Sequence, residues 1–179
     1  MRNDAEEMLG RAKAGDSAAF GWLVGEHQSM VFSITVYFFR NRAIAEEIAQ
    51  DVFLDLYRNL AGIENTAHLL AWLRRNATNR CIDRSRRKSY RAEVPVGADL
   101  HPVSWDSSPD VLAYAQVQRE LAALPAEQRV MIILRYGEGM MPGEIAEALE
   151  LPVNTVKSRL HRALGALRSK LELKKVQLT

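Results

Sequence analysis

Apolar positions recur at steps of three and four residues along most of the chain, which is the period of an α-helix that buries one face. The first stretch with this pattern predicts a helix over 17–39, although the β-branched and aromatic residues of its second half favour a strand by propensity. The continuous stripe decides for the helix, because it runs through both halves. Its positions are Phe20, Leu23, Val24, His27, Met30, Val31, Ile34 and Phe38.

The same period predicts two further helices in this half of the chain. One covers about 43–60, and its buried positions are Ile44, Ile48, Val52, Phe53, Leu56, Tyr57 and Leu60. The other runs from about residue 67 to 89, with inner positions Leu70, Leu73, Ala77 and Cys81. The first half of the chain is therefore expected to form a helical bundle.

The period stops over 92–110, where three prolines, one glycine and three serines indicate a linker. Helices resume over about 110–124, 126–136, 142–149 and 152–171, and Pro125 is expected at a first-turn position. The stripe of the first of these four helices is Val111, Tyr114, Val117, Leu121 and Leu124, and the second buries Val130, Ile133 and Leu134. The expected fold is all-α, with an N-terminal domain over 1–91, a linker over 92–110, a C-terminal domain over 111–175 and a tail over 176–179.

The last two predicted helices form a helix-turn-helix pair, since a short helix from Pro142 is followed by a tight turn and a longer basic helix from Pro152. The inward positions of the short helix are Ile145, Ala146 and Leu149, and those of the long helix are Val153, Val156, Leu160, Leu164, Leu167 and Leu171. The second helix of such a pair enters the DNA major groove. The C-terminal bundle is therefore predicted to bind DNA.

Helical geometry divides the basic helix into two faces. Asn154, Ser158, His161 and Arg162 lie opposite the apolar stripe, with Thr155 and Lys157 on the flanks. Asn154 and Arg162 suit base edges, whereas Thr155, Lys157 and Ser158 suit phosphates. Arg159 lies close to the stripe, so we expect it to pair with Glu144 or with a phosphate.

The net charge of +2 conceals two basic segments separated by an acidic one. Residues 74–91 carry eight Lys and Arg against one acid, residues 153–175 carry seven against one, and the linker carries four acids and no base. Two basic patches suggest two contacts with one polyanion, the alternative being solvated helix faces. The joining linker is thus acidic as well as extended.

Two features of the first half point beyond simple DNA binding. The helix over 43–60 turns Glu47, Asp51 and Asp55 outward at four-residue spacing, which suits a basic protein partner or a merely solvated face. Trp72 precedes the basic run of 74–91, a combination that suits single-stranded nucleic acid. The favoured alternative places Trp72 itself in the core and lets the arginines bind duplex phosphates.

Nothing in the sequence indicates catalysis. It has no cluster of metal ligands, no nucleophile–base pair and no phosphate-binding glycine loop, so no enzyme activity and no cofactor are expected. The single cysteine, Cys81, excludes an internal disulfide and fits a reducing cytosol. The N-terminus is polar and acidic, and the longest apolar run, 30–39, is too short to span a membrane. A cytoplasmic monomer with no membrane insertion is expected.

The chain resembles the extracytoplasmic-function (ECF) group of sigma-70-type RNA polymerase sigma factors in two blocks of sequence. The first block is AEEIAQDVFLDLY followed by WLRRNATNRCIDRSRR, and the second is GEIAEALELP followed by NTVKSRLHRAL. The resemblance runs from about Phe20 to Leu171. It implies a factor that binds core RNA polymerase and promoter DNA and initiates transcription. It also implies an anti-sigma partner, and a linker threaded through the polymerase near the RNA exit path.

The resemblance assigns roles residue by residue. The clamp coiled coil of the largest polymerase subunit would be bound by Glu47, Gln50, Asp51, Leu54 and Asp55. The loop 62–68 would capture a flipped base of the minus-10 element, a step that requires unstacking. Minus-10 recognition and melting would involve Asn65, His68, Trp72, Arg75, Asn79, Arg80, Asp83, Arg84, Arg86 and Arg87. The minus-35 element would be bound by Asn154, Thr155, Lys157, Ser158, Arg159, His161 and Arg162.

The sequence departs from the family pattern at four positions. Asn76 replaces an apolar residue, and an unpaired buried amide there would lower stability. Glu150 replaces the glycine of the helix-turn-helix turn, where a positive φ would be strained. Met141 replaces a capping serine or threonine, so the cap must come from elsewhere. Asn154 replaces a common glycine and adds a DNA contact.

Two other functions are compatible with the sequence. One is a helix-turn-helix regulator that never binds polymerase, and the other is an RNA-binding or RNA-modifying helical protein.

Overall fold

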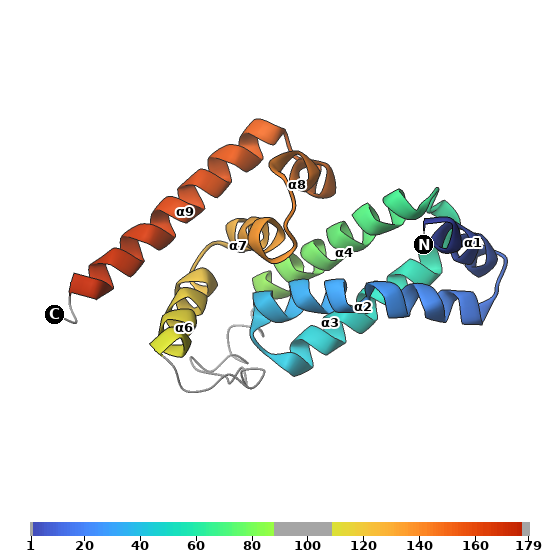
Figure 1. Cartoon of the computed structure of the whole chain (residues 1–179), viewed down its shortest axis with the longest axis horizontal. Helices are drawn as coiled ribbons and strands as arrows, with labels where there is room; N and C mark the ends of the chain where they lie inside the picture. Colours follow the sequence, from blue (N-terminus) through green and yellow to red (C-terminus); the bar gives the residue numbers. More distant parts are fainter. Residues whose placement is uncertain (1, 88–108, 177–179) are drawn as a thin grey trace. The chain divides into compact units, whose positions relative to one another are not determined.

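The computed structural model describes residues 2–87 and 109–176, with side chains over 4–87 and 116–171. Every element in these ranges is helical, which confirms the all-α prediction. The chain divides into two compact units, Met1–Arg86 and Arg87–Thr179, and each is considered by itself (Figure 1). The predicted linker and tail fall almost wholly outside the described residues, so the domain boundaries stay predictions.

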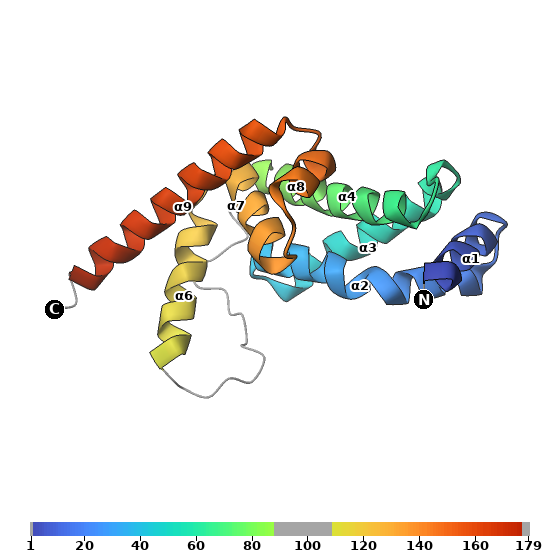
Figure 2. The same ribbon diagram turned by 45° about the horizontal axis from the view of Figure 1, so that its top comes forward.

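The first unit contains α1 (Arg2–Lys13), α2 (Ser17–Phe39), α3 (Arg42–Asn59), the 3₁₀ turn η1 (Leu60–Gly62) and α4 (Thr66–Arg86). Helix α2 packs against the other three helices, and α3 packs against α4, as Figures 1 and 2 show. The helix expected over 17–39 is confirmed over its full length, so burial of the stripe outweighs strand propensity. Helix α1 was not predicted.

Local chemistry ends and restarts the helices of this unit. Asp16 caps α2 by accepting hydrogen bonds from the amides of Ala18 (2.9 Å) and Ala19 (3.1 Å). Arg40 ends α2 in the left-handed conformation with φ 54°, and the side chain of Asn41 then caps α3. These short turns bring α2 and α3 side by side, where the buried Thr35 hydroxyl donates to the carbonyl of Ala45 (3.2 Å).

The core of the first unit follows the predicted stripes with two corrections. Its fully buried side chains include Leu23, Ile34, Phe38, Val52, Leu56, Leu73, Ala77 and Cys81. On α4 the first buried leucine is Leu69 rather than Leu70, because positions 69, 73, 77 and 81 follow a strict four-residue step. Tyr57 is 66% exposed and packs edge-on against Phe20, since it lies one helical step beyond the buried Leu56.

The second unit contains α6 (Pro109–Ala122), α7 (Ala126–Ile132), the π-helical turn η2 (Ile133–Gly137), α8 (Pro142–Leu149) and α9 (Val153–Val176). Helix α9 packs against α6, α7 and α8. The predicted helix over 126–136 therefore changes to a π-turn after Ile132, and Pro125 is the cap before α7 rather than a first-turn residue.

The apolar stripes of the second unit hold with two exceptions. Leu121, Leu124, Val130, Ile133 and Leu134 are buried, as predicted. Val117 and Val153 are exposed by 39% and 41%, so both predictions of burial are wrong. Val153 is the first residue of α9, before the helix reaches the core, and Gln118 is buried one position after Val117. The side chains of Val111 and Tyr114 lie outside the described residues.

Candidate functional site

Two residues noted above as departures, Met141 and Glu150, lie at the two ends of α8. The Glu144 carboxylate accepts a hydrogen bond from the amide of Met141 (2.6 Å), so the missing cap is supplied three residues later. Glu150 ends α8 with φ 52° and ψ 46°. Both expectations are confirmed. A left-handed residue other than glycine is strained by about 1 kcal/mol, and the turn that it makes is closed by the amide of Leu151, which donates to the carbonyl of Ala146 (2.9 Å).

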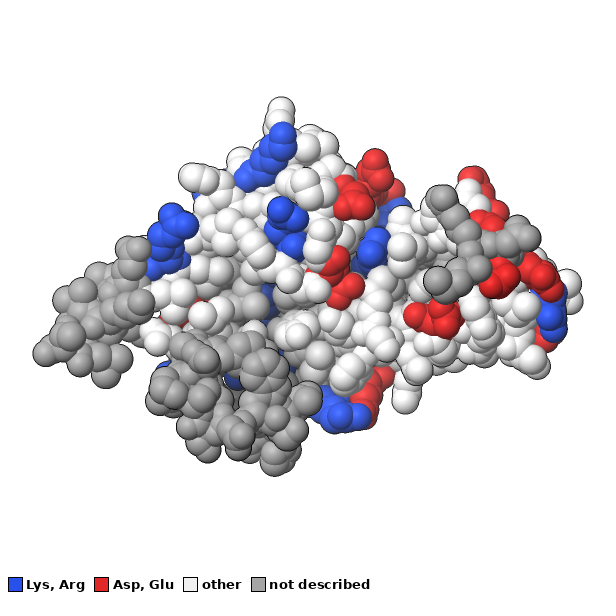
Figure 3. Space-filling model, viewed as in Figure 1, with Lys and Arg blue, Asp and Glu red and all other residues white. Residues whose placement is uncertain are grey.

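The basic helix α9 presents the predicted polar face. Val156, Leu160, Ala163 and Leu167 are buried against the unit. Five of the predicted DNA-binding residues are exposed and two are half-buried: the exposed ones are Asn154, Lys157, Ser158, His161 and Arg162, and the others Thr155 and Arg159. Figure 3 shows lysine and arginine side chains along this helix. The ion pair expected between Arg159 and Glu144 does not form, because Glu144 caps α8 instead.

The acidic side chains of α3 meet the basic side chains of α4. Arg80 donates to Asp51 Oδ2 through Nη1 (2.7 Å) and to Asp55 Oδ2 through Nε (3.0 Å) and Nη2. Arg84 lies 3.6 Å from Glu47. The exposed fraction falls from 56% for Glu47 to 44% for Asp51 and 23% for Asp55. The prediction of an outward-facing ladder therefore fits Glu47 and is wrong for Asp55.

Asn76 joins the same cluster. Its Nδ2 donates to Asp55 Oδ2 over 3.4 Å, while its Oδ1 is buried without a hydrogen bond. The expected inward amide is thus half satisfied, and the acidic cluster on α3 explains why an amide is tolerated at this position.

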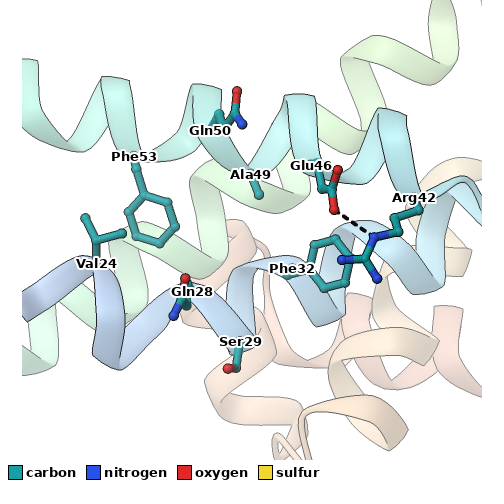
Figure 4. A pocket seen from close by; sticks show the side chains of 9 residues that line it. All are labelled: Val24, Gln28, Ser29, Phe32, Arg42, Glu46, Ala49, Gln50 and Phe53. Carbon is teal, nitrogen blue, oxygen red and sulfur yellow. Dashed lines mark hydrogen bonds and ion pairs between the residues drawn. The ribbon is translucent and has the colours of Figure 1, made fainter. Parts of the chain in front are cut away.

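The part of α3 that remains open to solvent contains the predicted polymerase-binding residues Gln50 and Leu54. Leu54 is 53% exposed, so it offers an apolar side chain on the open face of the helix. Beside it, a groove of about 390 Å³ runs between α2 and α3 (Figure 4). Its lining residues are Val24, Gln28, Ser29, Phe32, Arg42, Glu46, Ala49, Gln50 and Phe53.

The groove has an apolar and a charged part. Figure 4 shows Val24 and Phe53 facing one another across it. In the other part, Arg42 donates to Glu46 (2.8 Å) and its guanidinium lies 5.7 Å from the centre of the Phe32 ring. A partner helix could pack apolar side chains against Val24 and Phe53 and place a basic side chain beside Glu46.

The loop before α4 is braced at several points. Asn65 caps α4 by accepting from the amide of His68 (2.9 Å), and His68 Nδ1 accepts from the amide of Glu64 (3.2 Å). Glu6 of α1 accepts from both the amide (2.9 Å) and the hydroxyl (2.7 Å) of Thr66. Sequence reasoning missed Glu6, because nothing in a lone acidic residue signals a partner sixty positions away.

The other predicted minus-10 residues lie along α4. Arg75, Asn79, Asp83, Arg86 and Arg87 are exposed, and Trp72 is half-buried, which fits the favoured placement of its ring against the core. Arg86 lies 3.8 Å from Asp83. Arg80 and Arg84 differ from this group because their guanidinium groups are directed to the acids of α3.

Two titratable groups of the first unit have shifted pKa values. The hydrogen bonds from Arg11, together with those from the capped amides, hold the pKa of Asp16 below its usual value. Burial lowers the pKa of His27, which is half-buried in the α2 stripe. Neither group lies among the predicted binding residues.

The described residues contain neither a candidate metal site nor a candidate membrane-spanning helix. Across residues 2–87 and 109–176, no three His, Cys, Asp or Glu side chains gather as ligands of a metal ion. No helix in the same part of the chain is long and apolar enough to cross a membrane. Cys81 is a buried free thiol.

Known proteins match both units. Residues 23–91 match the family Sigma-70 region 2, and residues 114–167 match Sigma-70, region 4. The ECF RNA polymerase sigma factor SigW of Bacillus subtilis is 32% identical over 179 residues, covering 93% of this chain and 96% of SigW. The ECF sigma factor SigM of Mycobacterium tuberculosis is 32% identical over 166 residues, covering 93% and 83%.

Two solved structures share the fold. CnrH in complex with the cytosolic domain of CnrY has a TM-score of 0.69 at 24% identity, covering 95% of this chain and 98% of the other. The sigma factor RpoE of Bartonella quintana, in complex with the anti-sigma factor NepR, has a TM-score of 0.69 at 22% identity, covering 86% and 96%. With both family regions and near full-length relatives matched, this chain belongs to the ECF group of sigma-70-type RNA polymerase sigma factors.

Proposed function

We propose that the two units divide the work of a transcription initiation factor, with α9 binding the minus-35 element and α3 and α4 serving polymerase and the minus-10 element. The observation that carries this proposal is the polar face of α9, where Asn154, His161 and Arg162 are exposed opposite a buried stripe. An α-helix with this face fits the major groove, in which each base pair presents a distinct pattern of donors and acceptors.

Within α9, Asn154 and Arg162 read base edges, while Thr155, Lys157 and Ser158 hold phosphates. The Ser158 hydroxyl donates to the carbonyl of Thr155 (3.0 Å), and it exchanges this bond for one to a phosphate oxygen when DNA binds. Arg159 is half-buried beside the stripe and contacts a phosphate at the edge of the groove. Asn and Arg side chains make paired hydrogen bonds to adenine and guanine.

The polymerase coiled coil docks on the open face of α3. Leu54 supplies an exposed apolar contact, and Glu47 and Gln50 supply polar contacts on the same face. The groove between α2 and α3 extends this surface, because Gln50 belongs to both. Asp51 and Asp55 contribute negative charge but share it with Arg80. A basic, partly apolar helix of the polymerase matches this surface.

Arg80 then acts as a positioning residue for the docking face rather than as a DNA contact. Its three hydrogen bonds to Asp51 and Asp55 fix α3 against α4. The minus-10 contacts fall to the exposed residues of α4 and to the loop 62–68. Arg84 is shared between Glu47 and the promoter.

The cellular setting follows from this role. A factor that assembles with RNA polymerase acts in the cytoplasm as one copy per polymerase and has no catalytic step of its own. The structures of CnrH with CnrY and of RpoE with NepR carry partner proteins on the same fold. An anti-sigma factor that covers the α3 face and the second unit would hold this protein inactive.

The test is run-off transcription with core polymerase, using wild type and Leu54→Arg. Wild type should direct transcription from a promoter of its own genome region, and Leu54→Arg should lose core binding, because the substitution places a large cation against a basic partner. Ala14→Arg, at an exposed residue of the α1–α2 turn, is the matched control and should bind core as wild type does.

Two results would sink the proposal. The first is promoter binding by wild type without any stimulation of core polymerase, which is the behaviour of a helix-turn-helix regulator. The second is core binding by Leu54→Arg as tight as that by Ala14→Arg with an unchanged melting temperature, which would remove α3 from the docking surface.

A further inference from the structure

We propose that Glu6 of α1 is a positioning residue for the loop before α4, and that it thereby sets the base selectivity of this factor at the minus-10 element. The inference rests on the proposed function, because it assigns the loop to base capture. It adds a residue in a helix that lies outside both matched family regions, residues 23–91 and 114–167.

The contact has the geometry of a two-point clamp. One oxygen of Glu6 accepts from the backbone amide of Thr66 (2.9 Å) and from the hydroxyl of the same residue (2.7 Å). Thr66 is the first residue of α4, so its amide is one of the donors that a helix leaves without an internal partner. A carboxylate is favoured at this end of a helix by the helix dipole.

The clamp comes from a separate helix that is itself anchored. Leu9 and Ala12 of α1 are 2% and 6% exposed, and α1 packs against α2, α4 and η1. Glu6 therefore fixes the start of α4 relative to a packed helix. The caps made by Asn65 and His68 act only within the loop and cannot do this.

The opposite end of the loop is fixed by burial. Ile63 is 1% exposed and its amide donates to the carbonyl of Leu60 (3.1 Å). Only Glu64 and Asn65 stand between Ile63 and Thr66, and both are exposed. The two solvent-facing residues are thus held by the core on one side and by Glu6 on the other, so a shift of Thr66 moves Asn65 directly.

This arrangement predicts an effect on selectivity rather than on overall stability. The Glu6–Thr66 contact lies at the surface, where a hydrogen bond adds little to folding. A flipped base, in contrast, is distinguished by hydrogen bonds to its edge, and these depend on sub-ångström placement of the loop. Loss of the clamp should reduce the difference in transcription between promoters with different bases at the minus-10 element, while leaving the fold intact.

The experiment compares Glu6→Ala and Thr66→Val with two controls. Glu6→Ala removes the accepting carboxylate, and Glu7→Ala makes the same truncation at the next residue of α1, which pairs only loosely with Arg11 at 3.9 Å. Thr66→Ser keeps both donors. Run-off transcription is measured with core polymerase on promoters that share one minus-35 element and differ in single bases of the minus-10 element. The readout is the ratio of transcript from the best base to that from the next best.

Glu6→Ala and Thr66→Val should each lower this ratio at least about threefold, the size expected for one lost hydrogen bond. Glu7→Ala and Thr66→Ser should keep the wild-type ratio, and all four variants should melt close to wild type. An unchanged ratio in Glu6→Ala, or an equal loss of transcript from every promoter, would overturn the inference while leaving the proposed function intact. Absence of any wild-type transcript would contradict the proposed function itself.

Discussion

Helices α4 and α9 are both rich in arginine and lysine, yet the two units use these charges in different ways. In α9 the residues proposed to face the groove are exposed and the acid closest in sequence, Glu150, precedes the helix. In α4 Arg80 and Arg84 are directed to Asp51, Asp55 and Glu47 of the neighbouring helix. The same compositional signal therefore marks an exposed face, proposed to bind DNA, in one unit and a helix–helix joint in the other.

This difference affects DNA binding, because an arginine that already pairs with two carboxylates must break those ion pairs before it can bind a phosphate. Arg80 is 30% exposed, and its three hydrogen bonds occupy much of its guanidinium. Arg162 is exposed and donates one long hydrogen bond, 3.4 Å to the carbonyl of Ser158, which is readily exchanged. An Arg→Ala substitution at each position should separate the two roles.

The largest effect is expected for Arg162→Ala in DNA binding. Loss of a paired contact to a base should weaken binding of the minus-35 element roughly 10- to 100-fold and relax preference at one base pair. Fluorescence anisotropy with the polymerase-bound protein measures this, and the melting temperature should not change. Lys157→Ala is the control, since loss of a phosphate contact should weaken all sequences equally and reduce the salt slope by about 1. A sequence-independent loss in Arg162→Ala would place that residue on phosphate instead.

Arg80→Ala should show the reverse behaviour, with a loss of stability and little change in minus-35 affinity. Removing the cation leaves Asp51 and Asp55 close together and partly buried, so the free energy of unfolding should fall by about 1–2 kcal/mol. Chemical denaturation measures the change. Arg87→Ala, at an exposed position of the same segment, is the control and should unfold as wild type does. Equal stabilities would mean that the joint between α3 and α4 does not depend on Arg80.

The smallest effect concerns Asp16, whose pKa is lowered by its bonds with Arg11. Because the folded-state pKa is lower than the unfolded-state value, the charged form stabilises the fold above the unfolded pKa, and this contribution is lost as the pH falls through the folded pKa. Asp16→Asn should keep the cap but lose the ion pair. Its melting temperature should lie below that of wild type at pH 7, and the gap should close below about pH 4. A gap that persists in acid would assign the effect to the cap alone.

The helices were predictable because each buries one face, and a continuous stripe such as that of α2 records this burial in the sequence. Helix α1 was not predicted because it buries few apolar side chains, with Leu9 and Ala12 as its deeply buried residues. Errors of one helical step, as at Tyr57 and Leu70, arise because a stripe is wider than the contact it makes. Such positions at the stripe edge depend on how neighbouring helices pack.

The polar face of α9 was predictable for a related reason: one buried stripe determines which residues are opposite. The joint between α3 and α4 was not. Arg80 meets Asp51 and Asp55 across 29 and 25 residues of sequence, and that meeting depends on the rotation of two helices about their axes. Glu6 and Thr66 are separated further still. Contacts between elements determined by packing leave no local pattern.

The central claim, that the exposed face of α9 brings polymerase to a two-part promoter, is tested most directly by run-off transcription with the minus-35 element intact or scrambled. Wild type should lose most of its transcript when the element is scrambled. Arg162→Ala should give a low yield that barely changes on scrambling, while Arg80→Ala should keep the wild-type dependence at a temperature where it is folded. If Arg162→Ala responded to scrambling as strongly as wild type, α9 would not read the element through this face.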